Sequence, residues 1–528
     1  MSAKECIASG RAVLGIEFGS TRIKGVLIDE NFAPIAQGSH VWENRLEDGL
    51  WTYSIEDIWS GLQDCYADLR TNVLSQYGVE ITNLASIGVS AMMHGYMAFG
   101  ADGEILVPFR TWRNTNTGAA AAKLSELFEY NIPLRWSISH LYQCILEDCP
   151  HVGKIDFLTT LAGYIHWKLT GRRVLGVGDA SGMLPVDPAT CTYDASMVEK
   201  FDALVSPKSY PWHLLDILPE SLPAGADAGS LTAEGAVLLD TSGHLAAGIP
   251  MWPPEGDAGT GMVATNSVRQ RTGNVSAGTS SFSMIVLEKP LSRPYEPIDI
   301  VTTPDGSLVA MVHCNNCTSD LNGWVGILGG FMERIGAQGD IYKAVFDAAD
   351  SGDPDCGGLL SFNYISGEPV MGFADGRPLF VRGANDKFTF ENFARSILYA
   401  TVAVLKVGND LLTKNENVSV DRITGHGGLF KQPGVGQRIL GAALGSPISV
   451  METAGEGGAW GIALLAAYNV FNTNALALAD WLDEVVFAGN SGTSISPRKE
   501  DIEGFEKYIE NYKAALPVEE AAVRCKKC

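Results

Sequence analysis

Short apolar segments joined by turns of glycine and hydroxyl residues occur twice along this chain. One pair of segments spans residues 13–28, and the other spans residues 273–286. The turns consist of Gly19, Ser20 and Thr21 in the first copy and of Gly278, Thr279 and Ser280 in the second. Glycine lets the backbone turn tightly, and successive N–H groups and hydroxyls present donors to an anion. The pattern predicts two β-hairpins that would clamp a polyphosphate if they faced each other.

A helical pattern follows the first hairpin. Apolar residues repeat at helical spacing from Ile55 to Val73, after Ser54, which can cap a helix, and before Gly78, which can end it. Residues 85–90 then have the composition of a strand. Because strands and helices alternate with short connections, the predicted fold class is α/β.

The second half of the chain repeats this order of elements. A segment rich in proline and glycine, residues 248–261, precedes the second hairpin, and a long helix at 391–412 and a strand at 422–424 come after it. A chain of 528 residues is also longer than one hydrophobic core usually organises. We therefore expect two domains of similar architecture, residues 1–262 and residues 263–528.

A third glycine turn follows the predicted strand of the second half. It consists of Gly427, Gly428 and Leu429 and precedes a helical segment at about 434–444. Glycines at the end of a strand let a flat group lie against the backbone. The turn is therefore a candidate site for a nucleotide base or ribose.

Composition narrows the range of partners. The chain is 46% hydrophobic and 19% charged, as in ordinary globular proteins. Its net charge is −23, with no cluster of Lys and Arg to track a phosphate backbone, so we expect no nucleic-acid partner. No signal peptide is evident, and no apolar run reaches the roughly 20 residues that cross a bilayer. The sequence predicts a cytoplasmic protein that binds no membrane.

Ten cysteines in so long a chain argue against a disulfide framework. Two pairs have the spacing of metal ligands, Cys314 with Cys317 and Cys525 with Cys528. Structural zinc pairs normally lie closer together in sequence, and the second pair ends the chain. We favour free thiols over a zinc site, and no role for Cys314 and Cys317 follows from the sequence.

The ordered set of motifs resembles the FGGY carbohydrate kinases, members of the actin-like ATPase superfamily. The set comprises the first hairpin, the Met93-His94-Gly95 loop, residues 256–259, the second hairpin and the Gly427-Gly428 turn. Residues 177–184 and 456–463 also look like family segments, so that the resemblance covers nearly the whole chain. It implies two actin-like, ribonuclease H-like domains with an active-site cleft between them.

The resemblance implies that the chain binds ATP and Mg²⁺. Phosphate and nucleotide contacts would come from both hairpins, Lys24 and the glycine turn with Leu429. In the family, the acidic residue of the first hairpin helps to hold magnesium, usually through water; here it is Glu17, where aspartate is more usual. The extra methylene would move the carboxylate. The alternative is a strand glutamate that faces solvent.

Asp257 matches the catalytic base of the family, which accepts the proton of the sugar hydroxyl as its oxygen attacks the γ-phosphorus. Gly256 and Gly259 flank it and keep the backbone open to substrate. An aspartate among glycines and prolines is often only a turn former. The hairpin that follows Asp257 closely favours the catalytic interpretation.

Two further segments are implied to bind the sugar. Met93, His94 and Gly95 resemble a loop of xylulokinase-type members, and a neutral imidazole can donate and accept one hydrogen bond each. Trp112, Arg113 and Asn114 lie where many relatives have tryptophan, a variable residue and aspartate. The aromatic ring can stack on a sugar, and Asn114 can donate as well as accept where aspartate only accepts. This change bears on which sugar fits.

Other positions depart from the family pattern. Gly441 and Ala442 stand where relatives commonly have an Ala-Asp pair. Residues 392–399 resemble a C-terminal signature but end in Tyr399, where an acidic or amide residue is usual. These changes suggest a divergent subgroup, while Asp257 and the hairpin hydroxyls are retained.

Taken together, these features predict a MgATP-dependent kinase that phosphorylates the terminal hydroxyl of a ketopentose or similar open-chain sugar, xylulose-like or ribulose-like. A kinase for a different polyol or sugar acid is one alternative. An actin-like or chaperone-like ATPase without sugar kinase activity is another, as is a sugar-binding regulator that has lost catalysis. A homodimer is possible.

Overall fold

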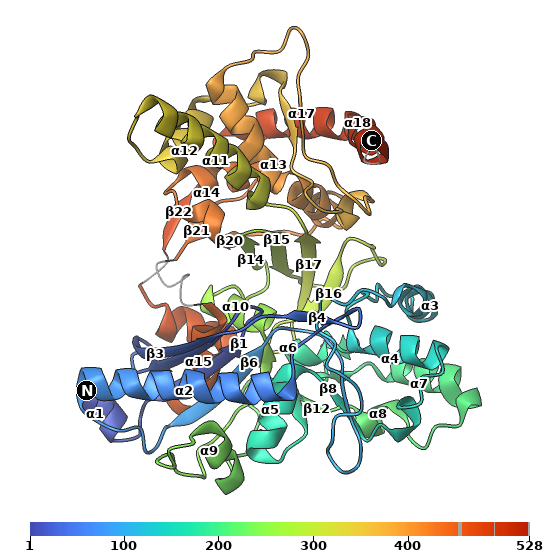
Figure 1. Ribbon diagram of the computed structural model, residues 1–528, viewed down its shortest axis with the longest axis vertical. Coiled ribbons are helices and arrows are strands. Elements are labelled where there is room, and N and C mark those ends of the chain that lie inside the picture. Colours follow the sequence, from blue (N-terminus) through green and yellow to red (C-terminus); the bar gives the residue numbers. More distant parts are fainter. Residues whose placement is uncertain (452–456, 490–491, 526–528) are drawn as a thin grey trace. The chain divides into compact units, whose positions relative to one another are not determined.

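The computed structural model describes residues 1–451, 457–489 and 492–525 (Figure 1). Glu456 and Cys528, which entered the sequence arguments, lie outside the described residues. The chain forms two compact units. The first comprises residues 1–268, 300–309 and 456–488, and the second comprises residues 269–299, 310–455 and 489–528. The expected boundary at residue 262 lies close to residue 268, where the chain first passes from one unit to the other. Residues 457–488, however, group with the first unit.

The first unit is built on a five-stranded sheet of order β13-β6-β1-β2-β3 (Figure 1). Its strands are β1 (Val13–Phe18), β2 (Arg22–Ile28), β3 (Pro34–Val41), β6 (Ser86–Ala91) and β13 (Glu255–Gly256). β1 and β2 form the predicted antiparallel hairpin, and β6 runs parallel to β1. The turn of this hairpin and the ends of β6 and β13 therefore lie at one edge of the sheet.

Helices cover both faces of this sheet. α2 (Ile55–Tyr77) packs on β3, and it begins after Ser54, whose side chain accepts the N–H of Asp57, and ends at the left-handed Gly78, as predicted. α15 (Gly457–Phe471) packs on β1. A Cβ atom at Gly15 would lie 2.2 Å from the carbonyl oxygen of Ala459, so only glycine lets this helix lie so close. This close packing explains why residues far along the chain return to the first unit.

Short elements complete the first unit. The strands pair as β4 (Arg45–Glu47) with β5 (Leu50–Thr52), β7 (Met97–Phe99) with β8 (Phe157–Thr159), β9 (Val174–Gly176) with β12 (Glu220–Leu222), and β10 (Val186–Asp187) with β11 (Thr192–Tyr193). The helices are α1 (Ala3–Ala8), α3 (Gly118–Phe128), α4 (Ser137–Leu146), α5 (Leu161–Thr170), α6 (Val177–Ala180), α7 (Ala195–Val205), α8 (Leu214–Ile217), α9 (Ala233–Leu239), α10 (Asp257–Ala264) and α16 (Leu478–Trp481).

Most of a seven-stranded sheet of order β16-β17-β15-β14-β20-β21-β22 belongs to the second unit, although residues 300–309, which include most of β16, group with the first. The strands are β14 (Thr272–Ala277), β15 (Ser281–Val286), β16 (Asp299–Thr302), β17 (Leu308–Cys314), β20 (Arg422–His426), β21 (Ile448–Val450) and β22 (Thr493–Ile495). β14 and β15 form the second predicted hairpin, and β20 runs parallel to β14. Each unit thus has a hairpin with a parallel strand beside its first strand, the similarity that the order of elements predicted.

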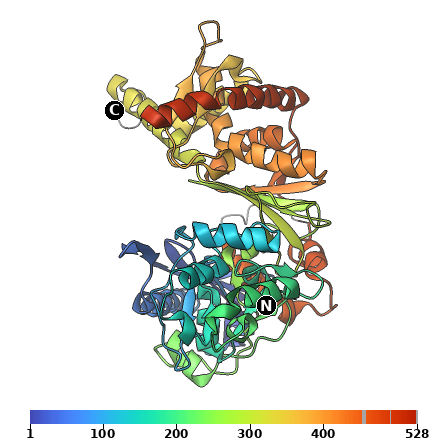
Figure 2. The ribbon, with the colours of Figure 1, turned by 90° about the vertical axis from the view of Figure 1, so that its right-hand side faces the viewer.

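Helices also surround the second sheet, and Figure 2 shows the red C-terminal helices running along this unit. They are α11 (Thr318–Ile335), α12 (Ile341–Ser351), α13 (Phe390–Asp410), α14 (Val435–Leu444), α17 (Lys499–Ala514) and α18 (Leu516–Arg524). A small pair of strands, β18 (Leu360–Phe362) and β19 (Leu379–Val381), lies between them in sequence. α13, β20 and α14 occur where the sequence predicted a long helix, a strand and a helix.

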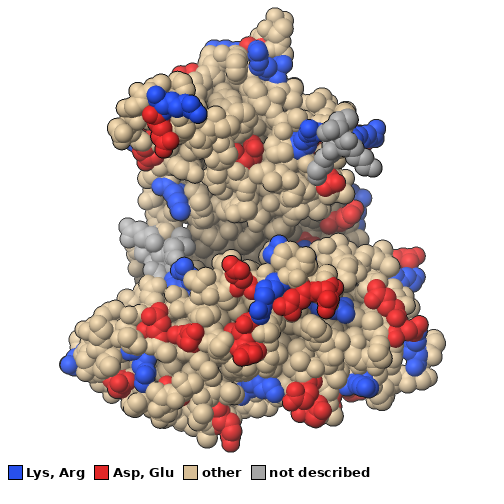
Figure 3. Space-filling view, viewed as in Figure 1, with Lys and Arg blue, Asp and Glu red and all other residues tan. Residues whose placement is uncertain are grey.

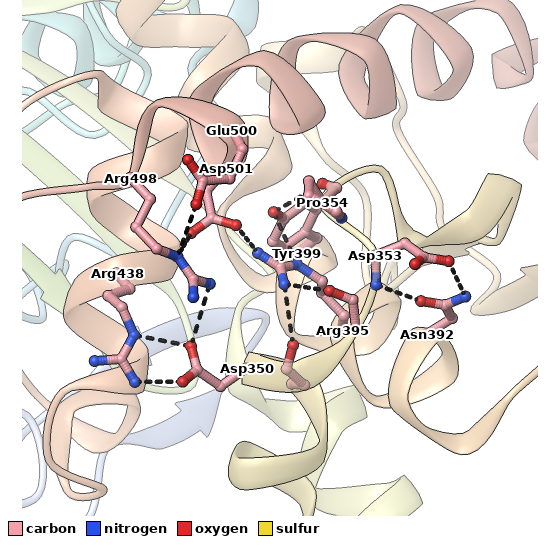
Figure 4. A network of polar contacts seen from close by, with 12 residues as sticks. Asp350, Asp353, Pro354, Asn392, Arg395, Tyr399, Arg438, Arg498, Glu500 and Asp501 are labelled. Carbon is pink, nitrogen blue, oxygen red and sulfur yellow. Dashed lines mark hydrogen bonds and ion pairs between the residues drawn. The ribbon is translucent and has the colours of Figure 1, made fainter.

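A buried ion pair joins α13 to α17 (Figure 4). Arg395 and Asp501 are paired, with side chains 3% and 2% exposed. The Tyr399 hydroxyl accepts a hydrogen bond from Arg395 Nε (3.0 Å) and donates one to the carbonyl of Pro354 (3.0 Å). Tyr399, one of the departures from the family pattern, therefore fixes the arginine of this pair.

The surface and the cysteines agree with an ordinary globular chain. Acidic and basic side chains lie interspersed on the face of the first unit seen in Figure 3. Among the described residues, no helix has both the length and the apolar character needed to cross a membrane. The cysteines in this part of the chain are free thiols, with Cys314 and Cys317 buried and Cys525 exposed.

Candidate active site

Aromatic side chains hold the turn of the first hairpin. Trp42 Nε1 donates to the carbonyl of Gly19 (2.7 Å), and the Tyr53 hydroxyl donates to the carbonyl of Ser20 (2.6 Å). Trp112 Nε1 donates to the hydroxyl of Ser20 (3.1 Å). Because a peptide plane points its N–H away from its C=O, fixing these carbonyls also fixes the N–H groups of Ser20 and Thr21. The turn is thus held with its predicted phosphate donors in set directions.

Sequence reasoning missed Trp42 and Tyr53. Both are buried, and their rings stack with centroids 4.0 Å apart. They follow strands β3 and β5, so no local motif joins them to the hairpin. The weak signal in the sequence was two large aromatic residues close to the ends of strands that otherwise carry polar residues.

Glu17 lies on β1, directly opposite Lys24 of β2. Its Oε2 accepts the N–H of Ala459 in the first turn of α15 (3.2 Å). Burial raises the pKa of Glu17 to about 7, and the charge of Asp257 adds to the rise, while the Ala459 N–H and Lys24 lower it. The longer glutamate side chain is therefore aimed at α15 and Asp257, and it does not simply face solvent.

Asp257 is the first residue of α10 and sits beside the Met93 loop. Its Oδ1 accepts the N–H of Met93 (3.1 Å). Burial raises the pKa of Asp257 to about 6, and the Met93 N–H lowers it less strongly. Glu17 and Asp257 both keep part of their surface exposed, as groups that meet a ligand must.

Two more carboxylates lie behind Asp257, each only 1% exposed. Glu255 accepts the N–H groups of Gly178 (3.2 Å) and Asp179 (2.9 Å), and Asp179 Oδ2 accepts the hydroxyl of Thr160 (2.6 Å). Burial raises the pKa of Glu255 to about 8 and that of Asp179 to about 7. Asp179 lies in a segment that resembled the family, whereas Glu255 was missed; its only signal was its place two residues before Asp257.

His94 is fixed in an unusual backbone conformation, with φ of 71°. Its Nδ1 lies 3.2 Å from the carbonyl oxygen of Gly182, and its ring stacks on Trp136 with centroids 6.3 Å apart. A carbonyl only accepts, so Nδ1 carries a proton, and in the neutral form of the ring Nε2 is the acceptor nitrogen. Gly95, with φ of 95°, completes the turn. The structure thus brings the Met93-His94-Gly95 loop together with Asp257.

The Trp112 segment contacts the first hairpin, and the side-chain amide of Asn114 is engaged with the main chain. Its Oδ1 accepts the N–H of Trp51 (2.9 Å), and its Nδ2 donates to the carbonyls of Trp51 (2.8 Å) and Thr111 (3.0 Å). The guanidinium of Arg113 stacks 3.5 Å from the centre of the Trp51 ring. Asn114 positions Trp51 in this structure because its amide is engaged with main chain, and direct sugar contact stays a prediction.

The second hairpin is held by the start of α11. The N–H of Cys317 donates to the carbonyl of Thr279 (2.9 Å). The N–H and the hydroxyl of Thr318 both donate to the carbonyl of Gly278 (3.0 and 2.7 Å). As in the first hairpin, fixed carbonyls set the directions of the following N–H groups, those of Thr279 and Ser280.

The third glycine turn lies against the second hairpin. Gly427 has φ of 102°, and a Cβ atom there would lie 2.6 Å from the carbonyl oxygen of Ala277. Gly427 and Gly428 are exposed, whereas the Leu429 side chain is fully buried. The structure brings the turn and the hairpin together, and Leu429 can offer a ligand only its main chain.

Two family models cover most of the chain. The N-terminal domain model of the FGGY family of carbohydrate kinases matches residues 12–258, and the C-terminal domain model matches residues 273–470. The chain belongs to the FGGY family of carbohydrate kinases. The chaperone-like alternative is therefore set aside, and this FGGY kinase is expected to use ATP, as its family does.

Relatives of this FGGY kinase are distant but span its whole length. It is 21% identical over 524 residues to the xylulose kinase of Lactococcus lactis, with 95% of each chain covered. Its fold is similar to that of a xylulose kinase from Rhodospirillum rubrum (TM-score 0.78, 19% identity, 96% and 99% of the chains covered). It is also similar to the Plasmodium falciparum glycerol kinase with ADP (TM-score 0.75, 14% identity, 96% and 98% covered). These likenesses confirm the predicted two-domain, actin-like α/β fold.

Proposed function

We propose that this FGGY kinase transfers the γ-phosphoryl group of MgATP to the terminal hydroxyl of a ketopentose or a similar open-chain sugar. The observation that carries the proposal is the hydrogen bond between Met93 and Asp257, which fixes a base beside the loop expected to bind the sugar. An ATPase that only changes conformation needs no such pairing. The xylulose kinase from Lactococcus lactis supports a xylulose-like or ribulose-like substrate.

Asp257 acts as the general base in this proposal. With its pKa raised to about 6, the carboxylate is ionised at neutral pH and is a better proton acceptor than an ordinary aspartate. It takes the proton of the sugar hydroxyl as the oxygen attacks the γ-phosphorus. His94 accepts a hydrogen bond from a sugar hydroxyl through Nε2, since its Nδ1 is held by Gly182.

The residues present fit a magnesium ion. Glu17 and Asp257 supply hard oxygen donors, and each disfavours the other's charge, a repulsion that a divalent cation relieves. Glu17 would hold the ion, with Asp257 nearby. When bound, Mg²⁺ neutralises charge on the transferring phosphoryl group. The Ala459 N–H sets the position of the Glu17 carboxylate, and the two hairpins present N–H and hydroxyl donors to phosphate oxygens.

A substrate panel tests the proposal. ADP release is measured with ketopentoses, aldoses, polyols and sugar acids, because structural neighbours include a gluconate kinase and a glycerol kinase. A ketopentose should raise turnover well above the basal ATPase rate. If no compound in the panel does so, the proposal is wrong.

The Asp257→Ala variant tests whether Asp257 acts as the base without contributing to nucleotide binding. Sugar phosphorylation should fall by about 10²–10⁴-fold, the usual contribution of general base catalysis, while MgATP still binds. Asp48→Asn is the matched control, because Asp48 is an exposed aspartate of the same unit. Full activity of the Asp257→Ala variant would contradict the assignment of the base.

A further inference from the structure

The segment Cys314-Asn315-Asn316-Cys317 has no role in the function proposed so far. Both thiols are 1% exposed, and burial raises the pKa of Cys317 to about 12 and that of Cys314 well above its usual value. Such thiols are poor nucleophiles at neutral pH. In the described residues, no group of three or more potential ligands surrounds a metal position. The polar contacts of this segment therefore come mainly from its two asparagines.

The buried carboxylate of Glu368 accepts hydrogen bonds from this segment. Glu368 is 0% exposed. Its Oε1 accepts the N–H of Asn315 (3.3 Å), and its Oε2 accepts the N–H of Asn316 (3.2 Å) and the Asn316 side-chain amide (3.1 Å). Three donors on one carboxylate compensate much of the cost of burying it.

Further hydrogen bonds join residues 315–317 to the loop of residues 363–368. Asn316 Oδ1 accepts the N–H of Ser366 (3.0 Å), and Asn315 Nδ2 donates to the carbonyl of Gly367 (2.8 Å). Asn363 Nδ2 donates to the carbonyl of Cys317 (3.1 Å). Residues 363–368 thus fix the direction of the chain at residues 315–317, where α11 begins.

The same segment holds the phosphate turn. The next two N–H groups along the chain, those of Cys317 and Thr318, donate to the carbonyls of Thr279 and Gly278. These bonds are main-chain bonds, so their geometry depends on where the loop lies and not on which side chain it carries. Glu368 accepts three hydrogen bonds from Asn315 and Asn316, the residues that precede these two N–H groups.

We infer that Glu368 is a positioning residue for nucleotide binding, which acts through Asn315 and Asn316 to hold the second hairpin with its phosphate donors in place. The inference rests on the proposed use of this hairpin for ATP phosphates. Glu368 itself touches neither the hairpin nor the substrate in this scheme. Removing the Glu368 carboxylate weakens ATP binding. The Met93-His94-Gly95 loop belongs to the first unit and stays unchanged.

Glu368→Gln tests the inference, because it keeps the shape of the side chain but places an amide N–H₂ against main-chain donors. We expect the Kd for MgATP, measured by calorimetry, to rise about tenfold, the effect of losing one or two such bonds. The KM for ATP should rise with it, and the KM for the sugar should stay within about twofold. A general loosening of the protein would raise both constants.

Glu519→Gln is the matched control. Glu519 is also 0% exposed, lies in the same unit and accepts a main-chain N–H, that of Arg377 (2.7 Å), but it does not contact the loop before α11. It should lower the melting temperature without changing the Kd for MgATP. Equal effects of the two variants on ATP binding would overturn the inference.

Asn363→Ala provides a second arm if Glu368→Gln does not fold. It removes only the bond to the Cys317 carbonyl, and we expect a smaller rise in the Kd for MgATP, about threefold; no change would count against the inference. Calorimetry needs no sugar, so the inference is tested even if the sugar panel fails. A wild-type protein that binds no MgATP would overturn both proposals, whereas normal ATP affinity of Glu368→Gln would overturn this one alone.

Discussion

The two hairpins proposed to bind phosphate have similar glycine and hydroxyl turns, but the turns are held in different ways. In the first, side chains from three separate places, Trp42, Tyr53 and Trp112, donate to the turn. In the second, the main chain at the start of α11 donates, with one added hydroxyl from Thr318. The first turn can therefore be loosened one side chain at a time. The second is held mostly by main-chain bonds, so a side-chain change loosens it less than moving the loop would.

The surroundings of the two turns differ as well. The first unit gathers four carboxylates with raised pKa values, namely Glu17, Asp179, Glu255 and Asp257. Near the second turn, Glu368 and Asp320 have raised pKa values, and each accepts hydrogen bonds from N–H donors close by. The carboxylates proposed for acid–base chemistry and for magnesium thus lie in the first unit.

The largest effect should come from pH. Burial raises the pKa of Glu255 to about 8 and that of Asp179 to about 7, above their unfolded values near 4. Groups with raised pKa values stabilise the folded state below the unfolded pKa, and this contribution is lost as pH rises through the folded pKa. Buried histidines with lowered pKa values act in the opposite direction, but only below the unfolded pKa of histidine near 6.5. Without ligands, the free energy of unfolding should therefore fall by roughly a few kcal/mol between pH 6.5 and pH 8.5. Urea unfolding followed by tryptophan fluorescence measures it.

Glu255→Gln sharpens this prediction, because it removes one titrating group of the first unit. The variant should lose the part of the pH dependence that Glu255 contributes, whereas Glu368→Gln should remove the smaller part that Glu368 contributes. Activity depends on pH in the opposite direction: kcat/KM should fall below about pH 6, where Asp257 becomes protonated. A stability that rises toward pH 8.5 would contradict the burial of these carboxylates.

An intermediate effect is expected for Trp42→Phe. The change leaves the Gly19 carbonyl without its donor and weakens the stack on Tyr53, so the free energy of unfolding should fall by about 1–3 kcal/mol. Because the turn loosens, the KM for ATP should rise and kcat should fall. Tyr53→Phe is the milder companion, since it removes one hydroxyl and keeps the ring. If neither change alters ATP kinetics, the aromatic donors are structural only.

The smallest effect should come from Thr318→Val in the second hairpin. It removes the hydroxyl bond to Gly278, but the main-chain bonds of Thr318 and Cys317 remain. We expect a loss of at most about 1 kcal/mol in the free energy of unfolding and a two- to threefold rise in the KM for ATP. An effect as large as that of Trp42→Phe would contradict the contrast between the two turns. Steady-state kinetics at saturating sugar distinguishes the outcomes.

Much of the fold could be predicted because it depends on local pattern. Hairpins, the helix from Ile55 with its Ser54 cap and Gly78 end, and the strand at Arg422 all carry their signals within a few residues. The return of α15 to the first unit could not be predicted, because its apolar residues fit any buried helix. Gly15, which lets it pack so closely, is indistinguishable in sequence from a turn glycine.

In the candidate site, too, residues in local motifs could be predicted and residues that act from a distance could not. Asp257, Glu17 and the Met93-His94-Gly95 loop could be proposed from the sequence because their motifs are contiguous. Trp42, Tyr53 and Glu368 were missed because each acts on a turn from a distant part of the chain, and a lone aromatic or glutamate carries no sign of its partner. Asn114 shows a further contact that the sequence did not predict: the side-chain amide of a residue in a family motif is engaged with the main chain of Trp51.

The return of α15 also has a consequence for synthesis on the ribosome. β1 and β6 emerge early, but the helix that covers them is made only after most of the second unit. During translation, one apolar face of the sheet of the first unit therefore stays exposed until α15 has been made. A chain in this state is prone to associate with other chains. A fragment that ends at residue 262 would keep that face permanently uncovered. Chaperone dependence during translation, followed by rapid closure once Phe471 has emerged, is the expected folding behaviour of this kinase.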